Sequence, residues 1–299
     1  MPDHQNQHQY QHNQNQGQRR VQRSGWAAQA GVFLVVAFIA AGACGALQPV
    51  TGIPPEVVQL TQLGPALAVA AVALLWPART KALLTGALPA RNTRPTNRAP
   101  RTPATGRSAL LPHLPLLLTP ALIIALSAGG LLLTSGTLPV TAPLALAHPL
   151  PLLVTAQLLG ACAEEIGWRC HLQPLLRTRF GPVTASVLVG TLWGLWHVPV
   201  LAQEPAYAAG FLTATIAMSV ILGLALERVR HNRLLLAGAF HTLVNLGMLF
   251  VTDETSPAAA PMVALGAACL AAALPWLVAA RRAATAPDKI TATTAHGTR

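Results

Sequence analysis

Long apolar runs separated by shorter polar stretches make up most of the chain. A run of about 20 apolar residues is long enough to cross the hydrocarbon core of a bilayer as a helix. Eight runs are predicted to do so: residues 26–47, 58–77, 109–134, 143–173, 183–202, 208–227, 234–252 and 258–280. Backbone groups in lipid must be satisfied internally and no run alternates at the period of a barrel strand, so we expect helices. The predicted fold class is an all-α polytopic membrane protein with eight transmembrane helices.

The basic residues lie on one side of these runs. If the N-terminus is cytoplasmic and eight helices cross, the cytoplasmic parts hold all of the 20 Lys and Arg residues except Arg169. The opposite connections carry acidic residues and no basic one: Glu56, Glu204, Asp253 and Glu254. The positive-inside rule therefore predicts that both termini are cytoplasmic.

Composition supports this assignment and argues against other classes. Only 10% of the residues are charged, against about 25% in soluble domains. The net charge of +11 does not indicate a nucleic-acid partner, because the basic residues fall between apolar runs or at the chain ends. The four cysteines are scattered without metal-binding spacing, so we interpret them as reduced apolar residues. The partner that composition indicates is the lipid bilayer.

The predicted organisation is one membrane domain between two polar ends. Residues 1–25 form a Gln-, Asn- and His-rich tail expected to be disordered and cytoplasmic. Residues 26–280 form the eight-helix domain, in which 78–108 is a basic, flexible cytoplasmic loop and 145–252 is the catalytic core. Residues 281–299 form a second cytoplasmic tail.

Polar and ionisable residues interrupt three of the predicted spans. They occur as Glu164-Glu165-x-x-x-Arg169, Trp193-x-x-x-His197 and His241-x-x-x-Asn245. Charge inside a bilayer is costly, so such residues indicate a functional site. At a helix rise of about 1.5 Å per residue, the three clusters lie about 10–20 Å from the cytoplasmic ends of their helices. They are therefore expected to share one cavity in the cytoplasmic half of the membrane.

Spacing suggests a role for each group. Glu165 and Arg169 are four residues apart on one helix face and can form an ion pair that orients the site. Glu164 points elsewhere and could take a proton from water, although it could also share the same arginine. His241 and Asn245 also share a face and could hold an oxyanion or a water, or simply join two helices.

The aromatic residues of the second cluster leave two interpretations open. Trp193 lies one turn before His197 and could pack against its imidazole. Trp193 and Trp196 could equally face lipid. Pro199 follows closely and is expected to kink the helix and open space for water.

Together the three clusters resemble the motifs of a known family. The run Glu164-Glu165-Ile166-Gly167-Trp168-Arg169 resembles the first motif of the CPBP (CAAX protease and bacteriocin-processing, or Abi) intramembrane glutamic endopeptidases. Trp193-x-x-x-His197 is similar to their second motif, and His241-x-x-x-Asn245 to the elements that follow. The resemblance covers about residues 145–252.

The resemblance implies a role for each site residue. Glu164, aided by His197, would activate the hydrolytic water, and His241 and Asn245 would stabilise the oxyanion. Glu165 and Arg169 would hold the geometry of the site. Two positions depart from the family pattern: Trp193 stands where Phe is more common, interpreted as a change of bulk, and Cys170 stands where Gly is common.

Zinc is a candidate ligand of this site, because members of the resembled family are often labelled metalloproteases. The chain has no HExxH motif, and Asn245 is a poor zinc ligand beside His241. Glu164, His197 and His241 could nominally supply three ligands. We predict a metal-free site with no cofactor.

The expected function is hydrolysis of peptide bonds in a peptide or protein substrate near the cytoplasmic membrane face. One alternative is a proton-coupled transporter, which would require ionisable residues in both halves of the membrane. Another is a non-catalytic immunity or scaffold protein, which would tolerate loss of Glu164 or His241. The Ala-, Pro- and Arg-rich composition suggests a bacterial cell membrane.

Overall fold

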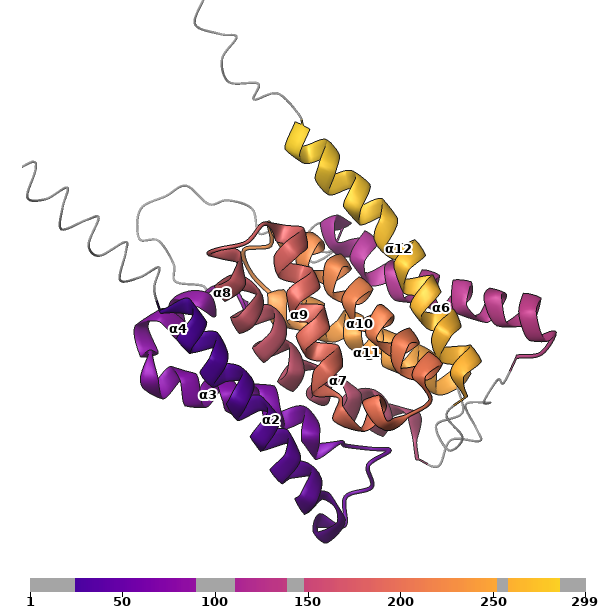
Figure 1. The fold of residues 1–299 in the computed structure, drawn as a ribbon, viewed down its shortest axis with the longest axis horizontal. Coiled ribbons are helices and arrows are strands. Elements are labelled where there is room, and N and C mark those ends of the chain that lie inside the picture. The colour runs from indigo at the N-terminus through magenta and orange to yellow at the C-terminus, as the bar shows by residue number, and fades with distance from the viewer. Residues whose placement is uncertain (1–24, 90–110, 139–147, 252–257, 286–299) are drawn as a thin grey trace, which may run out of the picture.

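The computed structural model describes residues 25–89, 111–138, 148–251 and 258–285, and these parts contain helices and turns but no strand (Figure 1). The elements are α2 (Trp26–Thr51), η1 (Leu60–Leu63), α3 (Gly64–Leu75), α4 (Pro77–Leu83), η2 (Leu111–His113), α6 (Leu114–Ser135), α7 (Leu150–Gly167), η4 (Trp168–Leu172), α8 (Gln173–Arg177), α9 (Pro182–Trp196), η5 (Val198–Ala202), α10 (Pro205–Ala225), α11 (Arg233–Val251) and α12 (Ala259–Thr285).

Six helical runs are long and apolar enough to cross a membrane. They are Trp26–Thr51, Leu111–Ser135, Leu150–Arg177, Pro205–Ala225, Arg233–Phe250 and Ala259–Thr285. The other two predicted spans are shorter apolar helices, Leu60–Leu75 and Pro182–Trp196. The all-helical, multi-pass architecture is thus confirmed, while the count of eight crossings and the orientation of the termini stay predictions.

Two segments differ from the sequence-based expectation. The predicted span 183–202 is interrupted after Trp196, because His197 leaves the helical conformation at φ −78° and ψ 62°. Pro199 disfavours helix for the residue before it, and the chain continues as the short 3-10 helix η5. The expected loop 78–108 begins instead within helix α4, which starts at Pro77. Residues 90–108 of that loop and the tail 1–24 lie outside the described residues.

The long helices form a closed ring of neighbours. Helix α7 packs on α11, α11 on α6, α6 on α12, α12 on α10, and α10 on α9. Helix α9 closes the ring against α8 and η4, which continue α7. Helices α2 and α3 pair with each other outside the ring and contact it through α3 and α7 (Figure 1). A ring of six helices can enclose a site built from several of them.

The ends of the helices define two faces. The start of α2, helices α4 and α8, and the end of α12 lie toward the upper left of Figure 1. The basic residues described outside the ring interior belong to this end, which we call the basic face: Arg79, Lys81, Arg177, Arg179, Arg228, Arg230, Arg233, Arg281 and Arg282. The other helix ends form the opposite face, which includes the connection from α2 to η1, η5, and the starts of α7, α10 and α12.

Candidate functional site

Glu164 is buried inside the helix ring. It lies on α7, and its side chain is held by a hydrogen bond from Nε1 of Trp193 on α9 to its Oε2, at 2.8 Å. A carboxylate bound by a polarised N–H is held in one orientation and retains its second oxygen as an acceptor. The first and second polar clusters are therefore joined by a hydrogen bond between α7 and α9.

His197 lies at the point where α9 ends. Its Nδ1 lies 2.9 Å from the backbone carbonyl oxygen of Trp193. Because a carbonyl can only accept, Nδ1 carries the proton and Nε2 of the neutral ring can accept one. The ring packs edge-on against Trp196 and Phe211, with centroids 4.9 Å away in each case. These contacts fix the imidazole plane.

Glu165 contacts both Arg169 and His241, and the contact with His241 was not expected from sequence. Its Oε2 forms an ion pair with Nε of Arg169 at 3.3 Å, and its Oε1 accepts a hydrogen bond from Nδ1 of His241 at 3.0 Å. All three side chains are almost completely buried. The Arg169 guanidinium also lies over the ring of Trp193, 4.7 Å from its centroid. Glu165 thus links η4 to α11 and orients His241.

The segment that carries Arg169 is not an ordinary helix. Residues Trp168–Leu172 form a π-helical turn, η4, between α7 and α8, and all five are buried. Such turns are rare and occur often at functional sites. Sequence periodicity assumes a regular α-helix, so it could not reveal this π-helical turn.

Asn245 has a partner that the sequence analysis missed. Its Nδ2 donates to Oε1 of Gln157 on α7, at 3.0 Å. A signal was present, because Gln157 precedes Glu164 by seven residues and so shares its helix face. The amide of Asn245 is therefore oriented from α7.

Glu164, His197, His241 and Asn245 all line one cavity of about 260 Å³, which we call the site cavity. Its remaining lining residues are mostly apolar or amides: Glu56, Gln59, Gln62, Leu153, Gln157, Trp193, Val200, Phe211, Ala214, Thr215, Met218, Val244, Leu246, Met248, Leu249 and Leu265. The three clusters thus meet, as expected. Glu165 and Arg169 lie behind the wall of the cavity.

One of the two interpretations left open for the aromatic residues is excluded. Trp193 and Trp196 are 2% and 6% exposed within the molecule, so they do not face lipid. The expected placement of the three clusters in the cytoplasmic half stays a prediction. Glu56, Gln59 and Val200, which also line the cavity, lie at the helix ends opposite the basic face, so the cavity extends toward those ends.

The metal-free site expected from sequence stays a prediction. Among the described residues, no three His, Cys, Asp or Glu side chains gather at distances suitable for a metal ion. Nδ1 of His197 and of His241 and one oxygen of Glu164 already have protein partners. What the cavity combines is a carboxylate, two oriented imidazoles and an amide. That set can accept a proton and stabilise a developing negative charge.

Comparison with known proteins matches the part of the chain that builds this cavity. Residues 146–247 match the family model described as Type II CAAX prenyl endopeptidase Rce1-like. The CAAX prenyl protease 2 of Methanococcus maripaludis is 32% identical over 111 residues, 33% of this chain and 41% of that protein. Lysostaphin resistance protein A of Staphylococcus aureus (strain MRSA252) is 26% identical over 109 residues, 36% of this chain and 26% of that protein.

The matched region spans less than half the length of these curated relatives. It contains all three polar clusters and the helices α7, α9, α10 and most of α11. Over residues 146–247, the chain is therefore similar to the CAAX-protease-like membrane proteins of the CPBP family.

Proposed function

We propose that this protein is an intramembrane endopeptidase of the glutamic type, which hydrolyses peptide bonds with a water activated by Glu164 and His197. The single observation that carries the proposal is the meeting of Glu164, His197 and His241 in one cavity within an apolar helix bundle. Its substrate is a peptide or protein that reaches the bilayer, and its location is the cell membrane of a bacterium.

The reaction begins with proton transfer to Glu164. The free oxygen of the carboxylate takes a proton from water while the water oxygen attacks the carbonyl carbon of the scissile bond. Nε2 of His197 orients that water by accepting its other hydrogen. A tetrahedral intermediate with a negative oxygen forms. When the C–N bond breaks, Glu164 returns the proton to the departing nitrogen. The products are a carboxylic acid and an amine.

The oxyanion is stabilised by His241 and Asn245. Oε1 of Glu165 accepts a hydrogen bond from Nδ1 of His241, so Nε2 is the ring nitrogen left for the cavity. Nε2 can donate to the oxyanion when the ring is protonated. The Asn245 amide retains one N–H after donating to Gln157. Fixed donors at a site of developing charge need no reorganisation during the reaction. Arg169 positions Glu165 and does not touch the substrate.

Glu164→Gln tests the proposal because it removes the base and keeps the size and the hydrogen-bond acceptor. Purified wild-type and variant protein, reconstituted in lipid vesicles, are incubated with a library of membrane-anchored peptides, and the products are read by mass spectrometry. We expect wild-type products that are absent with Glu164→Gln. Equal cleavage by both would contradict the proposal.

Similarity to a resistance protein supports a second candidate, a non-catalytic membrane protein that confers tolerance to an external agent. The same variant separates the two. Under this alternative, cells that express Glu164→Gln keep any tolerance that the wild-type protein confers. Under the peptidase proposal, tolerance and cleavage are lost together.

A further inference from the structure

A second pocket lies among η4, α8, the end of α10 and the start of α11, and we call it the basic-face pocket. Its volume is about 190 Å³, and among the described residues it shares no lining residue with the site cavity. Pockets for drug-sized ligands begin at about 300 Å³, so this one suits a smaller group. Its polar lining residues are Arg169, Gln173, Arg177, Glu227 and Arg233, and the others are apolar or glycine.

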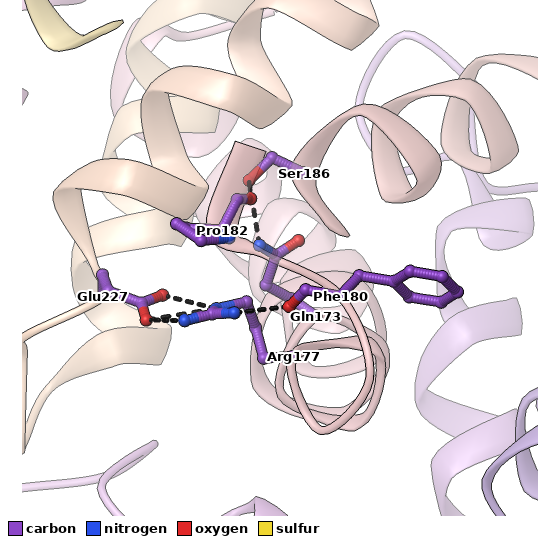
Figure 2. Close-up of polar contacts among 6 residues, drawn as sticks. All are labelled: Gln173, Arg177, Phe180, Pro182, Ser186 and Glu227. Atoms are coloured by element: carbon purple, nitrogen blue, oxygen red, sulfur yellow. Dashed lines mark hydrogen bonds and ion pairs between the residues drawn. The ribbon is translucent and has the colours of Figure 1, made fainter. Parts of the chain in front are cut away.

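Positive charge exceeds negative charge around this pocket. Arg177 forms an ion pair with Glu227 (Figure 2), and Arg169 is paired with Glu165 behind the pocket. The ion pairs that the described residues form do not include Arg233. Its Nη2 donates only to two backbone carbonyl oxygens, which are neutral. The charge of Arg233 is therefore left without a counter-charge.

Some of the buried donors around the pocket also lack an acceptor. In the part of the chain that the structure describes, Nη1 and Nη2 of Arg169 and Nε of Arg233 have no hydrogen-bond partner. The side chain of Arg169 is almost completely buried, yet it lines the pocket. A buried donor without an acceptor is costly, and more so when it is charged. These atoms indicate a ligand that supplies acceptor oxygens.

Gln173 adds a buried acceptor that lacks a donor. The hydroxyl of Ser186 donates to the carbonyl oxygen of Pro182 at 2.7 Å, so its oxygen accepts from Nε2 of Gln173 at 3.0 Å (Figure 2). This order fixes the amide, because a hydroxyl has a single hydrogen to donate. Oε1 of Gln173 is then buried with no donor among the described residues. A ligand that satisfies the whole pocket offers anionic oxygens to the arginines and a hydroxyl to Gln173.

A phosphate group has this chemistry. Guanidinium N–H groups match both carboxylate and phosphate oxygens. A carboxylate presents two oxygens in one plane, whereas the oxygens of a phosphate point in several directions and can reach arginines on separate segments. Hydrogen phosphate carries its own hydroxyl, and the headgroup of phosphatidylglycerol has glycerol hydroxyls beside its phosphate. Basic pockets between membrane helices also bind the headgroups of anionic lipids.

We propose that the basic-face pocket binds a phosphate group that carries or adjoins a hydroxyl, with Arg169 and Arg233 as donors and Gln173 as acceptor. The group belongs to a free hydrogen phosphate or to the headgroup of an anionic phospholipid. Glu227 at the rim weakens binding by repulsion between like charges. The ligand would contact the arginine that positions Glu165, but binding does not depend on the proposed hydrolysis.

Binding is measured with the full chain, purified in an uncharged detergent near neutral pH. One arm titrates sodium phosphate by calorimetry, with sodium chloride holding the ionic strength constant and sulfate as an anion without a hydroxyl. The other arm adds phosphatidylglycerol or phosphatidylcholine and counts the bound lipid by native mass spectrometry.

We expect phosphate, phosphatidylglycerol or both to bind the wild-type protein. Binding of phosphate alone would assign the pocket to the free ion, and binding of phosphatidylglycerol alone would assign it to the lipid headgroup. Sulfate and phosphatidylcholine should bind about ten-fold more weakly, because Oε1 of Gln173 would stay unpaired. Absence of binding by both phosphate and phosphatidylglycerol would overturn the proposal, and so would equal affinity for the probes that lack a hydroxyl.

Two variants of the lining should change the affinity in opposite directions. Arg233→Gln removes a charged donor and should weaken binding about ten-fold or more. Glu227→Gln removes an exposed negative charge and should tighten binding roughly two- to five-fold. Arg228→Gln is the matched control, because Arg228 is exposed beside Glu227 and does not line the pocket. Its Kd should stay within about two-fold of wild type.

The melting temperature without ligand shows whether each variant is folded. Arg233 also binds backbone carbonyls at and after the end of α4, so Glu227→Gln keeps the test decisive if Arg233→Gln fails to fold. An affinity that Glu227→Gln leaves unchanged or lowers would overturn the proposal. A loss in Arg228→Gln as large as in Arg233→Gln would also overturn it, since attraction to the whole basic face would then explain binding.

Discussion

The indole Nε1 of Trp193 lies 2.8 Å from Oε2 of Glu164, so a residue of α9 fixes the carboxylate of α7. The backbone carbonyl of the same tryptophan holds His197. One residue thus orients two protonatable groups. From sequence alone, Trp193 in place of the commoner Phe is only a change of bulk. The structure gives it a donor role that Phe lacks.

Trp193→Phe is therefore expected to lower kcat about ten-fold, because misplacement of a reacting group is costly even when its chemistry is intact. The backbone bond to His197 remains. Trp196→Phe is the matched control, since its indole donates to the carbonyl of Ala37 and not to Glu164. We expect kcat of the control to stay within about two-fold of wild type. Equal losses in both variants would contradict a specific role for Trp193.

Glu165→Gln should destabilise the protein strongly. It leaves the buried Arg169 without a counter-charge, and breaking a buried pair costs about 3–5 kcal/mol. The exposed pair of Arg177 and Glu227 provides the control, because Glu227→Gln should cost about 1 kcal/mol or less. Unfolding in detergent, followed by denaturant titration, measures both.

The double variant Glu165→Met, Arg169→Met separates stability from positioning. An apolar replacement of both charges should recover most of the unfolding free energy lost in Glu165→Gln. Activity should not recover, because His241 still lacks its acceptor. Recovery of activity together with stability would show that Glu165 has no part in positioning His241.

Gly238→Ala should reduce both stability and activity. A Cβ at Gly238 on α11 would lie 2.5 Å from Sγ of Cys162 on α7, so the two helices would have to separate. Glu165 follows Cys162 by three residues, and His241 follows Gly238 by three. Separation of the two helices would therefore also break the hydrogen bond between Glu165 and His241. Gly129→Ala on α6 is the control, because nothing lies within 4 Å of a Cβ there. Its expected effect is neutral or stabilising, since Ala is the better helix former.

Asn245→Ala should lower kcat about 10²–10³-fold with little change in KM, the usual loss when an oxyanion donor is removed. Gln157→Met removes only the acceptor that orients Asn245 and should have a smaller effect, about ten-fold. A kinetic comparison of the two variants with wild type measures the difference. If Gln157→Met were equal to wild type, the hydrogen bond would not position the amide.

Hydrolysis should persist after exhaustive chelation with 1,10-phenanthroline and EDTA. The proposed mechanism uses no metal, because the described side chains form no three-ligand group. Activity is measured before and after treatment, with elemental analysis of the same sample. Loss of activity that stoichiometric zinc restores would contradict the metal-free proposal.

The fold class and the identity of the polar clusters were predictable from sequence. Eight apolar runs predicted helices, and each became helical. Hydropathy and local spacing suffice here, because backbone groups in lipid must pair within their own segment. The i, i+4 pairing of Glu165 with Arg169 was equally local.

The arrangement of the clusters in space depended on contacts between distant segments. The bonds from Trp193 to Glu164, from His241 to Glu165 and from Asn245 to Gln157 each join residues on different helices. Hydropathy does not specify which helices become neighbours, because any apolar face can pack on another.

The shape of the cavity was likewise decided by tertiary structure. The end of α9 at Trp196, the π turn η4 and the packing of the α2–η1 connection each shift side chains relative to a regular helix. Sequence by itself determined that charged groups are buried in a helical membrane protein. Only packing decided which of them meet and which side chains line their cavity, because both depend on where helices break and how closely they approach.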